Sequence, residues 1–427
     1  MRVSFSPPPL FESLEPRLLL SSAPTGFSPA QIRSAYGFDQ AFFTTLAGQT
    51  IPADGAGQTI AIVTANAAPT IFQDLDTFSQ TFSLNGQQSI YSQYGPAESF
   101  LRAVPLSSDL LFDSGWAVET ALDVEWAHAI APQADILLVQ AASARVGDML
   151  NAVDFARQQP GVSVVSMSWG GNEFAGESLL DTYFTSPANH NPVTFVSASG
   201  DSGAGTSWPA VSPNVLAVGG TTLTLDSANN YLAESAWTLS GGGPSLLFNI
   251  PSWQTTPFTP LNATRNTPDV AYNADPATGF SVFTNTTFEN DTGWFTIGGT
   301  SAGAPQWAAL IAIANQGRAL YNLPSLDGPS QVFPTIYTLP NFYFNDITTG
   351  TNGFLTNPGY DLVTGRGSPN APLIINALQF LGTPETLTFL NPEVTPLNGA
   401  RSLYTQPAAT ITTPSLMPTA SAALPGI

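Results

Sequence analysis

The run Thr59-Ile-Ala-Ile-Val-Thr64 is apolar at its four central positions and lacks the polar alternation of a half-exposed strand. Runs of the same character recur at residues 134–139, 162–166, 193–197 and 215–218. Segments with helical periodicity lie between most of them, near residues 74–82, 116–130, 147–158 and 176–186. Apolar strands that alternate with helices indicate a parallel sheet with helices on both faces. The sequence therefore predicts an α/β, doubly wound fold.

The pentapeptide Gly298-Gly-Thr-Ser-Ala302 precedes a long apolar helical run that extends to Ala314. A glycine turn at this place projects one serine, Ser301, at the start of a helix. Backbone amides and the positive end of the helix dipole can stabilise an alkoxide there. Ser301 is therefore the candidate nucleophile.

A serine nucleophile needs a base, which is usually a histidine held by an aspartate. The chain has two histidines, and neither His128 on an expected helix nor His190 in a polar turn has the context of a catalytic histidine. Carboxylates offer another solution. Glu119 and Asp123 are four residues apart on the helix expected at 116–130, so their side chains share one face within reach of each other.

The apolar strand at 193–197 is followed by Ser-Gly-Asp-Ser-Gly, which places Asp201 at its carboxyl end, where α/β sheets locate their chemistry. Together, Glu119, Asp123, Asp201 and Ser301 resemble the sedolisin family, the serine-carboxyl peptidases. Other blocks of the chain fit the family in the same order: Val165–Gly170, Trp208–Thr221, Gly241–Ser245 and Pro268–Gly279.

The resemblance implies a subtilisin-like architecture and an acid-acting endopeptidase that hydrolyses proteins or peptides. By this match Glu119 is the general base toward Ser301 and Asp123 orients Glu119. Asp201 lies in the oxyanion hole, where only a protonated carboxyl can donate a hydrogen bond. Two neighbouring carboxylates cannot both ionise cheaply, so Glu119 and Asp123 are expected to titrate as a coupled pair.

The segments Phe344–Thr348 and Asn357–Gly365 resemble the family's C-terminal calcium site. The resemblance implies one structural Ca²⁺ bound by hard oxygen ligands. Asp346 and Asp361 would bind through their side chains, and Ile347, Asn357 and Gly359 through their carbonyls. The family more usually has glycine at the place of Asn357, and an ordinary Asx-type turn is the alternative.

Two departures from the family are visible. Sedolisin-like enzymes are normally made with a long N-terminal propeptide, whereas the catalytic-domain-like sequence here starts at Phe27. Some members carry an additional glutamate after the first strand that extends the catalytic hydrogen-bond chain. Thr64 is at the matching position, so this extension is expected to be shortened.

Three regions are expected along the chain: a leader at 1–26, a peptidase domain at 27–383 and a flexible tail rich in Pro, Thr, Ser and Ala at 384–427. Residues 224–300 are rich in Asn, Thr, Gly and aromatic residues, which predicts antiparallel strands and loops around the site. The leader contains Leu14-Glu-Pro-Arg17, which resembles the LEPR element of bacterial surface and exported proteins. A secreted or surface-associated protein is the implication, and an ordinary disordered leader is the alternative.

Composition excludes several classes of protein. The net charge is −20, and all ten basic residues are arginine, so the surface should repel nucleic acid and anionic membranes. There is no cysteine for a disulfide or a thiolate-bound metal. No apolar stretch is long enough for a transmembrane helix. We expect a monomer whose partners are its protein or peptide substrates.

The prediction is a secreted serine-type endopeptidase. The alternative is a catalytically silent or weak module that retains the fold and binds peptides or surface polymers. A glycosidase that uses the carboxylates is a weaker alternative, because it leaves Ser301 and Asp201 without roles.

Overall fold

The computed structural model describes residues 12–13, 19–21, 23–256 and 263–381. The chain divides into a unit of residues 1–379 and a second unit that begins at Phe380. The predicted tail at 384–427 and the Leu14–Arg17 element lie outside the described residues. The predicted domain boundaries therefore stay predictions.

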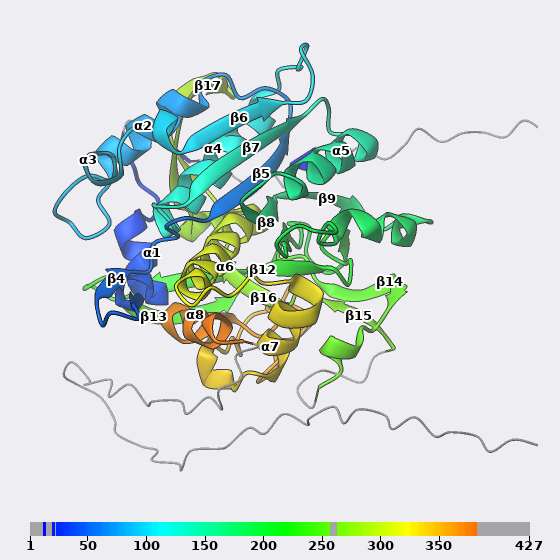
Figure 1. Ribbon diagram of the computed structural model, residues 1–427. Helices are drawn as coiled ribbons and strands as arrows, with labels where there is room; N and C mark the ends of the chain where they lie inside the picture. Colours follow the sequence, from blue (N-terminus) through cyan, green and yellow to red (C-terminus); the bar gives the residue numbers. More distant parts are fainter. Residues whose placement is uncertain (1–11, 14–18, 22, 257–262, 382–427) are drawn as a thin grey trace, which may run out of the picture. The chain divides into compact units, whose positions relative to one another are not determined.

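An eight-stranded sheet forms the centre of the first unit (Figure 1). Its strands are β5 Thr59–Ala65, β6 Leu101–Pro105, β7 Asp135–Ala141, β8 Val162–Met167, β10 Thr194–Ala198, β12 Val215–Leu225, β13 Tyr231–Ala236 and β16 Val270–Asn273. Their order is β13-β12-β10-β8-β5-β7-β6, and β16 also pairs with β12. All pairs are parallel except β12 with β13. All five apolar runs belong to this sheet, so the predicted doubly wound parallel sheet is confirmed.

The sequence did not indicate strand β6. It lies at the edge of the sheet, where only Leu101 is buried and Arg102 is exposed. A strand with so little buried surface does not need the continuous apolar run that identified the others.

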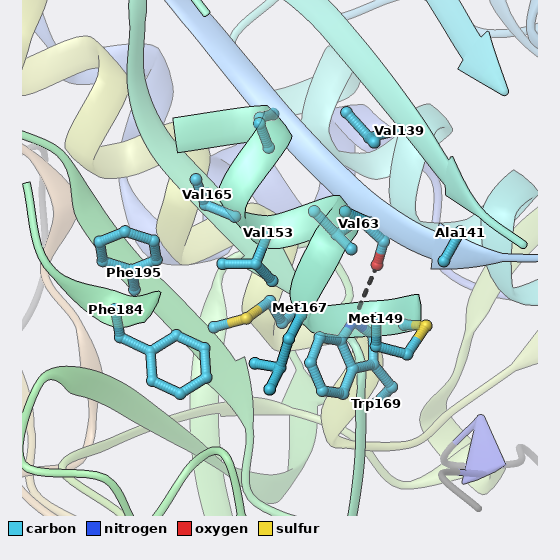
Figure 2. Close-up of a cluster of buried hydrophobic side chains, with 14 of the residues drawn as sticks. Val63, Val139, Ala141, Met149, Val153, Val165, Met167, Trp169, Phe184 and Phe195 are labelled. Carbon is cyan, nitrogen blue, oxygen red and sulfur yellow. Dashed lines mark hydrogen bonds between the residues drawn. The ribbon is translucent and has the colours of Figure 1, made fainter. Parts of the chain in front are cut away.

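Helix α5, Val146–Arg157, covers one face of the sheet. Figure 2 shows its Met149 and Val153 beside Val63, Val165 and Met167 of the strands. Burial of one such side chain contributes roughly 1.5–3 kcal/mol to folding. This cluster is the apolar core of that face.

Helices α4, Ser114–Ile130, and α6, Gly303–Ala319, pack against strands of the sheet and against each other. Almost every residue of both helices is buried. A helix that is buried on all sides, without a polar face toward water, is part of the protein core. The two helices therefore meet within the core, and α4 is covered in turn by α2, Ile71–Thr81, and β17, Phe280–Phe288.

The helices expected near 74–82, 116–130 and 147–158 are confirmed, but the segment 176–186 is a 3₁₀ helix, η3, from Glu177 to Phe184. Only its two end residues are buried, and Leu179 is 80% exposed. It has no continuous apolar stripe to hold an α-helix against the sheet.

The predicted change to antiparallel strands after residue 224 is confirmed. Strand β14, Gly243–Asn249, pairs with β15, Thr264–Thr267, and β17 pairs with β18, Asp291–Ile297. Two leader strands join the domain: β2, Leu19–Ser21, pairs with β18, and β1, Glu12–Ser13, pairs with β9, Trp169–Asn172. Strand β9 also pairs with β11, Ser207–Trp208.

The shorter elements are α1 Pro29–Tyr36, β3 Phe42–Thr44, β4 Thr50–Pro52, α3 Ile90–Tyr94, α7 Phe333–Thr338, β19 Phe344–Asn345, β20 Ser368–Pro369 and α8 Ala371–Gln379. Within the described ranges, no helix has the length and apolar character needed to cross a bilayer.

Candidate active site

Ser301 is buried in a 3₁₀ turn, Thr300–Ala302, that leads directly into α6. Two glycines make this turn possible. Gly299 has a φ of 116°, and a Cβ on Gly298 would lie 2.4 Å from the carbonyl oxygen of Ala274. A side chain at either position would strain or displace the turn. The structure thus places Ser301 where the sequence predicted it, at the start of a helix.

Helix α4 carries Glu119, the predicted general base, and Asp123, the residue predicted to orient it. Its first turn is capped by Asp113, whose side chain accepts a hydrogen bond of 3.0 Å from the backbone N–H of Trp116. On the following turns of the helix, the residue Glu119 is 1% exposed and Asp123 is fully buried. The same helix thus brings both carboxyl groups out of water on one face.

Burial is the main cause that raises the pKa of Glu119 well above its ordinary value. The carboxyl groups of Asp123 and Asp201 raise it further, and the Ser301 hydroxyl lowers it. Glu119 is thus within interaction distance of all three other predicted residues. Neither of its oxygens has a partner of full hydrogen-bond geometry in the described part of the chain.

Asp123 is held by a residue that the sequence analysis did not single out. The Ser168 hydroxyl donates a hydrogen bond of 2.6 Å to Asp123 Oδ1 and lies 3.3 Å from the carbonyl oxygen of Ser301. Burial raises the pKa of Asp123 to about 8, although the Ser168 hydrogen bond lowers it. Ser168 belongs to the block 165–170 that carried the resemblance, but a serine alone does not indicate such a role.

Asp201 follows β10, and its Oδ1 accepts hydrogen bonds of 2.8 Å from both the backbone N–H and the hydroxyl of Thr300. The Thr300 hydroxyl also accepts a bond of 3.1 Å from the Gly200 N–H. Asp201 Oδ2 is buried and has no partner among the described residues. Burial of this carboxyl group raises its pKa to about 7. Thr300, which the sequence analysis also missed, therefore fixes Asp201 beside Ser301.

Thr64 is the residue that the sequence analysis matched to the family's additional glutamate. Its hydroxyl accepts a hydrogen bond of 3.2 Å from Thr120 on α4. Trp169 donates a bond of 2.9 Å from its Nε1 to the carbonyl oxygen of Val63, drawn as a dashed line in Figure 2. Two buried neutral hydroxyls thus meet at this position. The shortening of the carboxylate network stays a prediction.

Neither histidine serves Ser301. His128 is fully buried and stacked on the ring of Phe100, and burial lowers its pKa to about 3. Within the described residues its ring nitrogens have no hydrogen-bond partner. His190 binds the backbone carbonyls of Asn191 and Gln159. The sequence-based exclusion of a histidine base agrees with these positions.

The predicted calcium ligands also lie together. Both carboxylate oxygens of Asp346 accept hydrogen bonds of 3.0 Å from the Gly359 N–H, and Asp361 Oδ2 accepts one of 3.1 Å from the Asn357 N–H. Ile347 follows Asp346 and is buried. The described residues contain no cluster of three or more acidic, histidine or cysteine side chains suited to a metal ion. Any cation here would rely on two carboxylates and backbone carbonyls.

Comparison with known proteins supports these observations. The subtilase family model matches residues 114–325. Kumamolisin from Bacillus sp. (strain MN-32) is 34% identical over 396 residues, which are 84% of this chain and 64% of the relative. Sedolisin from Pseudomonas sp. (strain 101) is 28% identical over 370 residues, which are 78% of this chain and 60% of the relative. Over most of its length the chain is therefore similar to these sedolisin-type peptidases.

A solved structure of Pseudomonas sedolisin, complexed with two molecules of pseudo-iodotyrostatin, matches this chain with a TM-score of 0.68 and 25% identity. The match covers 85% of this chain and 100% of that structure. The subtilisin-like fold is therefore confirmed. The chain spans less than two thirds of the length of kumamolisin and of sedolisin, with 64% and 60% covered.

The buried carboxyl groups of this candidate site predict that stability falls as pH rises. The pKa of Asp123 is about 8 in the folded chain, against about 3.9 for an unfolded aspartate. Between these values the folded state binds more protons, so its free energy of unfolding decreases toward higher pH. Asp123→Asn cannot ionise and should flatten the decline of the unfolding temperature between about pH 4 and 8, measured by calorimetry.

Asp109→Asn is the matched control, because Asp109 is exposed. It should retain the wild-type pH dependence. Identical profiles for wild type and Asp123→Asn would contradict the raised pKa of Asp123.

Proposed function

We propose that this protein is an acid-acting serine-carboxyl endopeptidase. The observation that carries the proposal is the convergence of Ser301, Asp123 and Asp201 on the buried carboxyl group of Glu119. A buried serine beside a carboxylate base, with a second carboxyl group aimed at the same place, is an arrangement for acyl transfer.

In the proposed mechanism the Ser301 hydroxyl attacks the carbonyl carbon of the scissile peptide bond. Glu119 accepts the hydroxyl proton and then delivers it to the leaving amine. Asp201, protonated and with its Oδ2 free of other partners in the described structure, donates a hydrogen bond to the developing oxyanion. Water then hydrolyses the acyl-enzyme by the same steps in reverse.

The proposed mechanism requires one negative charge on the Glu119–Asp123 pair. The first proton leaves more readily than the second, because the second must be removed in the presence of the first charge. The Ser168 hydrogen bond stabilises a charge on Asp123, and the Ser301 hydroxyl stabilises one on Glu119. Activity should therefore rise with the first ionisation of the pair, which must precede the loss of the Asp201 proton near pH 7. The pKa of about 8 for Asp123 then describes the second ionisation of the pair.

Secretion or attachment at the cell surface is part of the proposal. It is supported by the resemblance of the leader to an export element and by an acidic chain with a sequence pI near 4.1. Such a chain loses its self-repulsion only when its carboxylates become protonated. The proposed substrates are proteins and peptides.

We also propose that the protein binds one structural Ca²⁺. The carboxylates of Asp346 and Asp361 both meet the turn from Asn357 to Asp361, and Ile347, Asn357 and Gly359 lie beside them. Two carboxylates and three carbonyl oxygens are ligands of the type that Ca²⁺ prefers. The ion would bridge the segment that follows β19 and the loop at residues 357–361, and it would thereby stabilise the domain.

Hydrolysis of denatured casein from acid to neutral pH tests the activity. Ser301→Ala should reduce kcat about a thousandfold or more, because no other group supplies the nucleophile. Glu119→Gln should reduce kcat about 100- to 10,000-fold through loss of the base. Glu98→Gln, at an exposed glutamate, is the control and should remain active. A folded wild-type chain without activity at any pH would favour the silent peptide-binding module.

The oxyanion role of Asp201 predicts how activity ends at high pH. The wild-type rate should fall as pH rises through about 7, because Asp201 loses its proton. Asp201→Asn keeps a neutral hydrogen-bond donor, so its rate should stay constant through this pH range. The rate of Asp201→Ala should be about 100- to 1000-fold lower than that of wild type at all pH values. Initial rates and circular dichroism at each pH separate loss of catalysis from unfolding. An unchanged alkaline decline in folded Asp201→Asn would contradict the assignment.

Removal of calcium should lower thermal stability. A ligand at a hundred times its Kd stabilises the folded state by about 2.7 kcal/mol. Adding Ca²⁺ after EGTA treatment should therefore raise the unfolding temperature of wild type and of Asp109→Asn, but not of Asp346→Asn. A calcium response that persists in Asp346→Asn would place the ion elsewhere.

A further inference from the structure

Residues 245–248 of strand β14 leave the ladder that pairs this strand with β15. Gly243 and Pro244 face residues of β15, and the pairing resumes only at Asn249. The N–H groups of this bulged segment therefore need acceptors outside the ladder, because backbone donors in folded chains are rarely left without a partner.

Glu173, the residue after β9, supplies these acceptors. Its Oε2 accepts a hydrogen bond of 2.9 Å from the Leu246 N–H, and its Oε1 accepts one from the Ser245 hydroxyl. The Ser245 hydroxyl oxygen in turn accepts bonds of 3.0 and 2.8 Å from the N–H groups of Leu247 and Phe248. One carboxylate thus holds the whole bulged segment.

The same carboxylate reaches the segment that follows Asp201. Its Oε2 also accepts a hydrogen bond of 2.8 Å from the hydroxyl of Thr206, which lies between Asp201 and β11. Gly241, shortly before β14, donates a bond of 2.6 Å from its N–H to the carbonyl oxygen of Gly200. The bulged segment is therefore connected to the surroundings of Asp201 on two sides.

A second carboxyl group, Glu177 of η3, acts on Glu173. It is fully buried, and its Oε2 accepts a hydrogen bond of 2.7 Å from the Phe174 N–H. Its Oε1 has no partner of full hydrogen-bond geometry among the described residues. Burial is the main cause that raises the pKa of Glu177 to about 7. The Phe174 hydrogen bond lowers this pKa, and the charges of Glu173 and Asp181 raise it.

No arginine forms an ion pair with either member of this carboxyl pair in the described part of the chain. Helix α5, which packs against η3, carries Asp148, Asp154 and Arg157, and its arginine pairs with Asp154. The other acidic residue of η3 is Asp181. Only negative charges therefore raise the cost of ionising Glu177, and a proton is what allows the two carboxyl groups to lie together.

We infer that Glu173 is a positioning residue and that it forms, with protonated Glu177, a clamp that fixes residues 245–248 beside the surroundings of Asp201 for peptide binding. The inference rests on the proposed function, because the bound partner would be the peptide substrate. Glu173 keeps the charge that accepts the bonds from the bulged segment, and Glu177 keeps the proton. Leu246, whose side chain is 84% exposed, is thereby held in one place.

The clamp should be tighter in acid than at neutral pH. Glu177 has a pKa of about 7 in the closed clamp, against about 4.3 for an ordinary glutamate in an open one. Between these two values opening releases a proton. The equilibrium constant for opening should therefore rise about tenfold for each pH unit in this window and stay level above it.

Hydrogen exchange at residues 245–248 tests the clamp, measured by mass spectrometry from acid to neutral pH in full-length chains that carry Ser301→Ala, so that nothing is cleaved. Each rate is divided by the intrinsic exchange rate at that pH, so that the ratio reports opening. One chain adds Glu177→Gln, which cannot ionise. Its matched control adds Glu98→Gln, at an exposed glutamate. A peptide from strand β7 reports global unfolding in both.

We expect opening to increase about tenfold per pH unit between about pH 4.3 and 7 in the control chain, and to be constant in the Glu177→Gln chain. Glu173→Gln should open the segment at every pH. Ser245→Ala, which removes the acceptor of two N–H groups, replaces that variant if it does not fold. Equal pH dependence with and without Glu177, or opening that only follows β7, would overturn the inference.

The role in peptide binding has a separate measurement. With Ser301 restored, Glu173→Gln should raise the KM for casein at least about tenfold, because only chains with the segment in place bind tightly. Its kcat should be unchanged, since Thr300 holds Asp201 independently. A KM equal to that of Glu98→Gln would overturn this role. If no chain hydrolyses casein, the proposed peptidase activity fails, whereas the exchange comparison still decides about the clamp.

Discussion

The buried hydrogen bond from Ser168 to Asp123 is the contact on which the arrangement of the site depends. It joins the end of β8 to the middle of α4, and the same hydroxyl reaches the backbone of the Ser301 turn. Three elements that are far apart in the sequence are thereby held around one buried carboxyl pair. The packing of α4 against α6 makes this contact possible, because both helices are buried on all sides and cannot shift without exposing apolar surface.

The exclusion of water from the three buried carboxyl groups is the second constraint on the site. Burial raises the pKa values of Glu119, Asp123 and Asp201, and no arginine forms an ion pair with any of them among the described residues. A site that contains carboxyl groups without cations holds protons into a range where ordinary carboxylates have lost them. The same property that suits Asp201 to donate a hydrogen bond makes the folded chain less stable as the pH rises. The stability in acid and the hydrogen-bond donation proposed for Asp201 thus have one physical origin.

The leader extends two of the small sheets next to the candidate site. Its two short strands pair with β9 and β18, which are the segments that run out of Ser168 and into Ser301.

The sequence alone determined the parallel sheet and the four residues of the candidate site. Continuous apolar runs have few alternatives to buried strands, and the glycines before Ser301 and the spacing of Glu119 and Asp123 act locally. It did not reveal strand β6, the 3₁₀ form of residues 177–184, or the roles of Ser168 and Thr300. Nor did it indicate that leader strands pair with the domain. Those features depend on partners distant in the chain, because a hydroxyl or a backbone edge acquires its role only when tertiary packing brings a specific acceptor within hydrogen-bond distance.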